Sequence, residues 1–422
     1  MRKPGGRKIR LGVLTGMITG ALVTALGAPA AASPAAGPGR PDPAPLRVGG
    51  PVTAPDRYIV VLSDAPTGAE RADGSARAAR TARAATVAEQ AGGTVLTRYT
   101  HVLDGYAAQL SPTALAAVRA DPAVAYVERD SRIEGSLTGD MSIQATQPSP
   151  PSWGLDRIDQ RYLPLNNSFG YTTTGSGVTV YVVDSGIRAS HVDFGGRASG
   201  VYDAVRDGNG TNDCHGHGTH VAGTIGGATY GVAKAVTIKA VRVLQCDNSG
   251  WTTDLIDGVD WLAGHHDARS VANFSLQGYG TAANTAVENL IDSGVQPVFA
   301  AGNYSTDACT NGPRSARGIT VGATDSTDNR ASFSNYGTCV DIFAPGVNIT
   351  SAGIASDTAV GSGWSGTSMA APHVTGWLAR YRQQNPNATL AQAKSSLIAA
   401  ATTNVVINPG TGSPNRLLYV AP

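Results

Sequence analysis

The stretch that most constrains the fold is Gly-Thr-Ser-Met-Ala-Ala-Pro-His-Val at residues 366–374, where a turn of small residues leads into an apolar helical pattern. Pro372 suits the first turn of that helix, because the N–H group that proline lacks would have no intrahelical partner there. Ser368 on such a turn can point its hydroxyl into a cleft that the unpaired N–H groups of the helix start also face. The stretch therefore suits a nucleophile beside an anion-binding pocket, although Gly-Thr-Ser turns also occur as ordinary helix caps.

Two upstream motifs carry the residue types that a serine nucleophile needs. The run 177–186 is apolar and rich in β-formers, and Asp184 lies near its end, where open α/β sheets place functional groups. His217 lies between glycines at a predicted helix start. A serine hydroxyl becomes a good nucleophile when a base takes its proton and a third group orients that base. The alternative is a turn aspartate and a packed histidine that meet these criteria by chance.

The motifs are Asp-Ser-Gly at 184–186, His-Gly-Thr-His at 217–220 and Gly-Thr-Ser-Met-Ala at 366–370. They resemble the three active-site motifs of the subtilisin-like serine peptidases, in the same chain order. The resemblance implies that Asp184 orients the imidazole, His217 acts as general base and then general acid, and Ser368 attacks the scissile carbonyl. The segment 300–303, Ala-Ala-Gly-Asn, is similar to the family's oxyanion segment. That similarity implies that Asn303 donates its side-chain amide to the tetrahedral oxyanion.

Charge and length narrow the classes of partner. The net charge is +1 and 15% of the residues are charged, so no electrostatic argument favours nucleic acid or an anionic membrane. With 422 residues, the chain is long enough for two or three domains and a large core. We therefore expect no nucleic-acid partner, and we also expect no membrane anchor and a monomer. The resemblance to the peptidases implies polypeptide substrates, with the chain's own propeptide as inhibitor and folding aid.

The N-terminal 32 residues read as a signal peptide, with a basic start, an apolar run at 11–26 and small residues at 28–32. A membrane anchor is the alternative, but the run is short and contains three glycines. We therefore expect a secreted, extracellular protein. Residues 33–55 are rich in proline, alanine and glycine and predict a flexible linker.

Residues 56–144 predict a small α+β domain. The predicted elements are a strand at 58–62, a helix at 70–91, strands at 94–96 and 105–110, a helix at 112–120 and a strand at 124–128. This order suits a split-βαβ sandwich, and it resembles the inhibitory propeptide of the same peptidase family. The resemblance implies a tail at about 130–144 that lies in the substrate cleft, with self-cleavage near Gln144-Ala145. A permanent binding module is the alternative.

Residues 145–422 predict the catalytic domain, an α/β three-layer fold around a mainly parallel sheet. The predicted strands are at 178–183, 236–243, 271–276, 296–301 and 318–322, and helices begin near residues 217, 253, 282, 368 and 389. The family resemblance covers nearly all of 145–422. It is closest to the proteinase K and aqualysin subgroup.

All four cysteines fall in this domain, and an exported chain meets an oxidising environment. Four cysteines allow three pairings, between which the sequence alone does not choose. The subgroup resemblance implies the pairs Cys214–Cys246 and Cys309–Cys339. A zinc site is the alternative for the cysteine and histidines of 214–220, but the closed ligand spacing is absent.

Calcium is the expected ion, as a structural ligand of oxygen-rich extracellular loops; we expect no catalytic cofactor. Residues that match calcium positions of the subgroup are Asp156, Asp159, Gln160 and Asn166 for one site and Asp341 for a second. The segment 313–319, which would complete the second site, is one residue shorter than in relatives. The alternative role of Asp156 and Asp159 is ordinary capping of a helix start.

The resemblance also implies the walls of the substrate cleft, which are Ser275, Leu276, Gln277 and Gly278 on one edge and Ala300, Ala301 and Gly302 on the other. Substrates of such enzymes add a strand to the edge, so main-chain hydrogen bonds bind them. Small uncharged walls favour an apolar or aromatic P1 residue, the residue whose carbonyl is attacked. Relatives usually carry glycine in place of Gln277, and this bulkier side chain narrows the cleft. Alternative functions are a catalytically silent binding protein with the same fold and an esterase that uses the same triad.

Overall fold

The computed structural model describes residues 42–50, 53–63, 74–135, 142–144, 152–278, 280–311 and 315–421. Residues 42–422 form one compact unit. The predicted signal peptide, the first part of the predicted linker and Ala145 lie outside the described residues.

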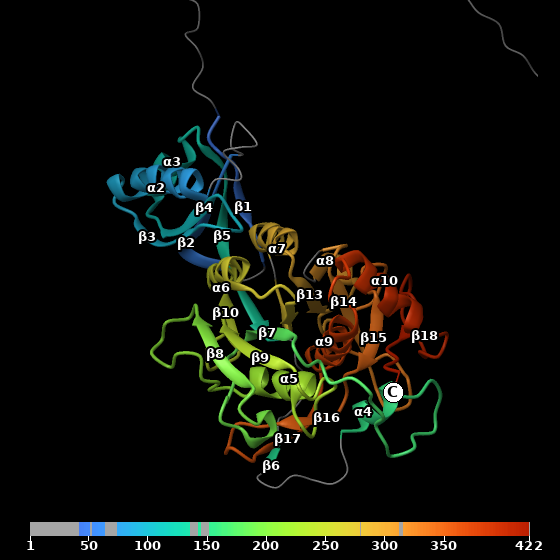
Figure 1. Cartoon of the computed structure of the whole chain (residues 1–422). Coiled ribbons are helices and arrows are strands. Elements are labelled where there is room, and N and C mark those ends of the chain that lie inside the picture. Colours follow the sequence, from blue (N-terminus) through green and yellow to red (C-terminus); the bar gives the residue numbers. More distant parts are fainter. Residues whose placement is uncertain are drawn as a thin grey trace, which may run out of the picture. The chain divides into compact units, whose positions relative to one another are not determined.

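The N-terminal domain has the predicted α+β order. Its strands are β1 (Leu46–Val48), β2 (Thr53–Leu62), β3 (Thr94–Tyr99), β4 (Gly105–Gln109) and β5 (Val124–Gly135), and its helices are α2 (Gly74–Gln90) and α3 (Pro112–Arg119). The strand order is β1-β5-β2-β4-β3 (Figure 1). β1 lies within the predicted flexible linker and pairs with β5, so the domain begins before residue 56. The linker prediction is therefore wrong for this part.

Strand β2 shows how one sheet serves two cores. Val60 points toward α2 and α3, and packs with the alanines of α2. Its neighbours Ile59 and Val61 point the other way, into a core shared with helices of the following domain. Side chains alternate across a strand, so an unbroken apolar run here means burial on both faces.

The second domain is built on a nine-stranded sheet with the order β18-β19-β15-β14-β13-β11-β7-β9-β8. The predicted strands are present as β7 (Thr179–Asp184), β9 (Thr237–Arg242), β11 (Val271–Phe274), β13 (Gln296–Ala300) and β14 (Ile319–Thr324). Four further strands, which the sequence did not reveal, extend the sheet: β8 (Ala198–Asp203), β15 (Ile342–Pro345), β18 (Thr402–Thr403) and β19 (Arg416–Leu417). All neighbouring pairs are parallel except β18 with β19.

Helices cover both faces of this sheet, which confirms the three layers (Figure 1). One face packs on α5 (His217–Gly226) and α9 (Thr367–Gln384), and the other packs on α6 (Thr252–His265) and α7 (Thr281–Ser293). Strand β7 supplies residues to both cores: Val180 and Val182 to the first, Tyr181 and Val183 to the second. The shorter elements are β6 (Ser142–Gln144), α4 (Trp153–Ile158), a 3-10 turn (Val192–Phe194), β10 (Ser249–Trp251), β12 (Leu276–Gln277), α8 (Ala308–Asn311), β16 (Ile349–Ala352), β17 (Val360–Trp364) and α10 (Leu390–Ala400).

Both disulfide pairings implied by the resemblance are present. The Cα atoms are 5.0 Å apart in Cys214–Cys246 and 5.2 Å apart in Cys309–Cys339, and the described residues contain no free cysteine. The bridges span 32 and 30 residues, and loops of this length contribute about 3 to 4 kcal/mol each when unstrained.

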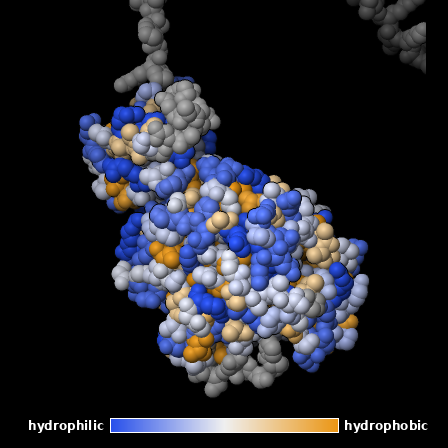
Figure 2. All heavy atoms as spheres, in the orientation of Figure 1, coloured by the Kyte–Doolittle hydropathy of each residue, from blue (hydrophilic) through white to orange (hydrophobic). Residues whose placement is uncertain are grey.

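On the face drawn in Figure 2, hydrophilic residues predominate and hydrophobic residues are scattered among them. None of the described helices has the length and apolar character needed to span a lipid bilayer.

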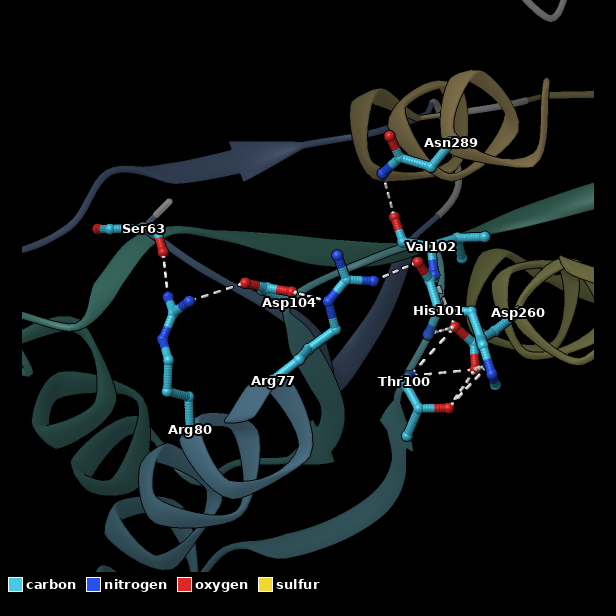
Figure 3. A network of polar contacts seen from close by, with 9 residues as sticks. All are labelled: Ser63, Arg77, Arg80, Thr100, His101, Val102, Asp104, Asp260 and Asn289. Atoms are coloured by element: carbon cyan, nitrogen blue, oxygen red, sulfur yellow. Dashed lines mark hydrogen bonds and ion pairs between the residues drawn. The ribbon is translucent and has the colours of Figure 1, made fainter. Parts of the chain in front are cut away.

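Helices α6 and α7 hold the loop that joins β3 to β4, residues 100–102 (Figure 3). The carboxylate of Asp260 on α6 accepts the backbone N–H groups of Thr100 at 3.1 Å, of Val102 at 2.8 Å and of His101. Asn289 on α7 donates to the carbonyl of Val102. Backbone groups of this loop thus help to fix the N-terminal domain to the second domain.

We predict that Asp260→Ala weakens this docking, because three backbone N–H groups lose their acceptor at once. The expected cost is about 2 kcal/mol, and it is measured as faster hydrogen exchange at the amides of residues 100–102 in the full chain. Asp292→Ala is the control, since Asp292 makes an exposed ion pair with Arg317, far from the loop at 100–102 in sequence. Unchanged exchange in Asp260→Ala would contradict the assignment.

Candidate active site

Asp184 and His217 meet at the carboxyl end of β7. The Nδ1 atom of His217 lies 2.7 Å from Oδ1 of Asp184, and both side chains are fully buried. Asp184 ends its strand, and His217 begins α5. The approach requires glycine at position 218, where a Cβ atom would lie 2.1 Å from the carbonyl oxygen of Gly186. The structure therefore brings the predicted base and its orienting carboxylate together.

Asp213 holds this pair in place, and the sequence analysis missed it. Its carboxylate accepts the hydroxyl of Ser185 at 2.9 Å and the backbone N–H of Thr219 at 2.8 Å, along with the amides of residues 215 and 216. Ser185 in turn accepts the N–H of Gly218. Burial raises the pKa of Asp213, and the hydrogen bonds it accepts oppose that rise. The available signal was an aspartate four residues before His217, in position to accept from the first turn of the helix.

Ser368 is the second residue of α9 and is fully buried. Its hydroxyl donates to the carbonyl of Ser275 at 2.9 Å, and the hydroxyl of Ser275 donates to the carbonyl of Ser368 at 2.9 Å. Helix α9 packs against α5, and Trp364, four residues before Ser368, lies with its ring centroid 6.5 Å from that of His217. The Nε2 atom of His217 has no hydrogen-bond partner among the described residues.

Asn303 lies on the other side of Ser368, on the segment after β13. Its Oδ1 atom accepts the backbone N–H of Thr367 at 2.9 Å and the hydroxyl of Thr367 at 2.8 Å. These bonds fix the amide, and its Nδ2 group is buried with no partner among the described residues. Gly302 reaches this geometry with a φ angle of +97°, which favours glycine. The arrangement leaves one N–H donor unsatisfied beside the start of α9.

Asn335 supports the segment that carries Asn303. Its Oδ1 atom accepts the backbone N–H groups of Tyr304 and Thr306, and its Nδ2 group donates to the carbonyl of Ala301 at 2.8 Å. The sequence indicated no role for Asn335. Its hydrogen-bond partners lie 29 to 34 residues away in the chain, so no local sequence pattern could predict them.

The predicted cleft walls adjoin Ser368 on both sides. Ser275 exchanges hydrogen bonds with Ser368, and the N–H of Gly302 donates to the hydroxyl of Thr367 at 3.0 Å. Leu276 and Gln277 form β12, with Gly278 after it, while Ala300 and Ala301 end and follow β13.

The end of β5 lies between β12 and β10 as the middle strand of three. Arg132, Ile133 and Glu134 pair antiparallel with β10, and Glu134 and Gly135 pair antiparallel with β12. Ile133 is fully buried and belongs to the core that α6 and α7 share. The strand predicted for 124–128 therefore continues to Gly135, because edge strands of the second domain complete its hydrogen bonds. The chain's own segment therefore lies along the edge that the sequence analysis predicted to bind a peptide.

The predicted cleavage position is not on the part of β5 that pairs with β10 and β12. Gln144 is in β6, whose backbone pairs with Val360 of β17. Cleavage near Gln144-Ala145 remains a prediction.

The first predicted metal group is held mainly by backbone donors. Asp156 accepts the N–H groups of residues 166 and 167, and Asp159 accepts that of Gly170 at 2.6 Å. Asn166 uses its Oδ1 atom within its own turn, to Ser168. Two buried oxygens, Oδ1 of Asp159 and Oε1 of Gln160, have no hydrogen-bond partner among the described residues, and burial raises the pKa of Asp159. These two oxygens are chemically suited to a hard cation.

At the second predicted metal position, Asp341, a lysine lies against the carboxylate. The Nζ atom of Lys394 lies 2.9 Å from Oδ2 of Asp341, 2.8 Å from the carbonyl oxygen of Ala316 and 2.6 Å from that of Gly318. A lysine ammonium therefore supplies the positive charge that the prediction gave to calcium. Among the described residues, no cluster of three or more His, Cys, Asp or Glu side chains could hold a metal ion.

The remaining histidines near the site are kept neutral by burial. The pKa of His220 is lowered to about 3, and those of His215 and His373 to about 4. The ring of His220 stacks on Trp364 with centroids 4.5 Å apart. Neutral rings of this kind suit packing inside the domain.

Comparison with known proteins finds two family matches along the chain. Residues 175–417 match the subtilase family, and residues 57–135 match peptidase inhibitor I9. An "Extracellular serine proteinase" of Thermus sp. (strain Rt41A) is 53% identical over 323 residues, which is 76% of each chain. "Proteinase R" of Parengyodontium album is 39% identical over 391 residues, covering 90% of this chain and 92% of the relative.

A solved structure described as that of a cold adapted subtilisin-like serine proteinase matches with a TM-score of 0.62 at 50% identity. The match covers 64% of this chain and 98% of that one. With a family match across 175–417 and relatives of this identity and coverage, the chain belongs to the subtilase family of serine proteinases and carries an I9 inhibitor propeptide before its catalytic domain.

Proposed function

We propose that this subtilase is a secreted endopeptidase whose reaction uses Asp184, His217 and Ser368. The observation that carries the proposal is the buried hydrogen bond between Asp184 and His217 at 2.7 Å, in a helix start that packs against the helix of Ser368. A carboxylate on Nδ1 fixes the tautomer of the ring and leaves Nε2 as the base. Secretion is supported by the predicted signal peptide and by a relative named an extracellular proteinase.

In the proposed reaction, the hydroxyl of Ser368 leaves the carbonyl of Ser275 and donates to Nε2 of His217. As His217 takes the proton, the Ser368 oxygen attacks the peptide carbonyl, and Asp184 stabilises the imidazolium that forms. His217 then protonates the leaving amine. Water repeats the sequence to release the acyl group.

The negative oxygen of the tetrahedral intermediate needs donors that are already in position. Asn303 supports this role, because its Oδ1 atom is occupied by Thr367 while its Nδ2 group is buried without a partner among the described residues. The backbone N–H of Ser368, at the start of α9, is the second proposed donor.

We propose that the enzyme is made as a self-processed zymogen in which residues 132–135 block the cleft. Their pairing with β10 and β12 is the geometry expected of a bound peptide strand. We further propose that it acts as a monomer. The uncharged walls of the cleft support an apolar P1 residue.

A catalytically silent binding protein is the second candidate. The observation that favours it is the hydroxyl of Ser368, which bonds the carbonyl of Ser275 and not His217.

We predict that a fluorophosphonate labels Ser368 in the purified protein and that Ser368→Ala abolishes labelling and leaves the precursor uncut.

Mass measurement of the secreted wild-type product should give an N-terminus within several residues of Ala145. A folded but unlabelled wild type would support the silent binding protein, and normal processing of Ser368→Ala would show that another protease does the cutting. Casein and short esters, assayed in parallel, separate a peptidase from an esterase.

We predict that Asn303→Ala lowers kcat by about 10²- to 10³-fold with little change in KM, because its amide acts on the oxyanion and not on the ground state. Steady-state kinetics on one peptide substrate provides the measurement. Asn335→Ala serves as the comparison, since it loosens the same segment without removing the donor. A larger loss of kcat in Asn335→Ala than in Asn303→Ala would count against the assignment.

We propose one structural calcium ion, held with the participation of Asp159 and Gln160, whose unpaired buried oxygens fit it. Such an ion would tie the loop after α4 to the body of the domain. Near Asp341 the positive charge belongs to the side chain of Lys394 and not to a bound ion.

We predict that variants at Asp159 and at Lys394 differ in how their stability depends on calcium. Both are measured as melting temperature in the Ser368→Ala background. Asp159→Asn should remove the rise that calcium produces. Lys394→Met should destabilise the protein by about 2 kcal/mol with or without calcium, because two carbonyls and a carboxylate lose their partner. A calcium effect that survives Asp159→Asn, or a neutral Lys394→Met, would contradict the respective assignment.

A further inference from the structure

We propose that Gln277 sets the size of the P1 residue, so that this enzyme prefers small uncharged P1 side chains such as alanine. This inference rests on the proposed function and narrows the apolar or aromatic preference expected from the sequence. Gln277 is on β12, two residues after Ser275, and only 5% of its surface is exposed.

The side chain of Gln277 crosses from one wall of the cleft to the other. Its Nε2 group donates to the hydroxyl of Tyr304 at 3.0 Å, and its Oε1 atom accepts the backbone N–H of Asn303 at 3.2 Å. A Cβ atom on Gly302 would lie 3.6 Å from the same Oε1 atom. One carboxamide therefore joins β12 to the segment after β13.

A substrate cannot avoid this bridge. Its attacked carbonyl must lie at Ser368, which is bounded by Ser275 on one side and by Thr367 and Gly302 on the other. The P1 side chain then extends between the two walls that the carboxamide connects.

Pairing with an extended peptide strand holds the backbone of Gln277 at the edge of the cleft. In the structure, the backbone of Gln277 pairs with Glu134 of β5, so the residue is part of the edge that holds an extended peptide. A main-chain pairing of this kind is the same for every substrate sequence. The side chain of Gln277, unlike its backbone, takes no part in this pairing and bonds the opposite wall.

Size discrimination follows from the two hydrogen bonds. A methyl group at P1 needs little of the space between the walls, whereas an aromatic ring must displace the carboxamide. Displacement leaves the N–H of Asn303 and the hydroxyl of Tyr304 without the partner that Gln277 gave them. We therefore expect at least a tenfold preference for alanine over phenylalanine in kcat/KM.

The test uses four peptides that differ only at P1, which is alanine, leucine, phenylalanine or lysine. In wild type, kcat/KM should fall in the order Ala, Leu, Phe. Gln277→Gly should raise the ratio of Phe to Ala by at least tenfold. Tyr304→Phe, which removes one partner of the carboxamide and leaves Gln277 in place, should shift the same ratio in the same direction by a smaller factor.

Gln277→Glu is the matched control, because a carboxylate of the same shape can still accept from the N–H of Asn303 and from the hydroxyl of Tyr304. It should keep the low ratio of Phe to Ala and should add cleavage after lysine. A wild type that prefers Phe to Ala overturns the inference. So does an unchanged ratio in both Gln277→Gly and Tyr304→Phe. Loss of all cleavage and of fluorophosphonate labelling in wild type overturns the proposed function itself.

Discussion

The strength of the hydrogen bond between Asp184 and His217 depends on the exclusion of water from both side chains. The neighbouring residues of the site hold the two side chains in that buried position. A carboxylate and an imidazole at a water-exposed position gain little from each other, because solvent competes for both. Here both side chains are fully buried. The helix that carries His217 can approach the end of β7 because Gly218 lies against the carbonyl of Gly186. Asp213 then holds the first turn of the same helix through its backbone N–H groups.

The oxyanion side of the site shares its support with the substrate cleft. Asn303 is fixed from one direction by Thr367, which precedes Ser368, and from another by Gln277 on the opposite wall. In our interpretation, the group that limits the P1 side chain is thus bonded to the residue that stabilises the reaction. A substitution of Gln277 that changes the P1 preference would therefore also change the rate, because Gln277 accepts the backbone N–H of Asn303.

At Asp341 a lysine side chain supplies a positive charge at the position where the sequence analysis expected a metal ion. Lys394 reaches a carboxylate and two carbonyl oxygens at 2.6 to 2.9 Å. A bound ion stabilises a fold only in proportion to its concentration and affinity, whereas a tethered ammonium is always present. The second domain also completes the N-terminal one, since β5 extends to Gly135 on hydrogen bonds from β10 and β12.

The sequence by itself determined the layered α/β fold and the order of the functional motifs, because each is written in a local pattern. The resemblance of those motifs to a known family added the family and the disulfide pairs, which the residues alone left open. Strand β7, for example, shows as an unbroken apolar run that is buried on both faces. Strands β15 and β19 are only four and two residues long, and they exist because neighbours distant in the chain pair with them.

Only the tertiary structure decided what Lys394 and Gln277 do. Lys394 meets Asp341 across 53 residues of sequence, and Gln277 meets Tyr304 across 27. Local sequence encodes the elements that carry such side chains, but their partners are fixed only when the packing of the elements sets the distances between them. For that reason the sequence did not show that Asp341 pairs with a lysine, or that Gln277 bonds Tyr304 and Asn303.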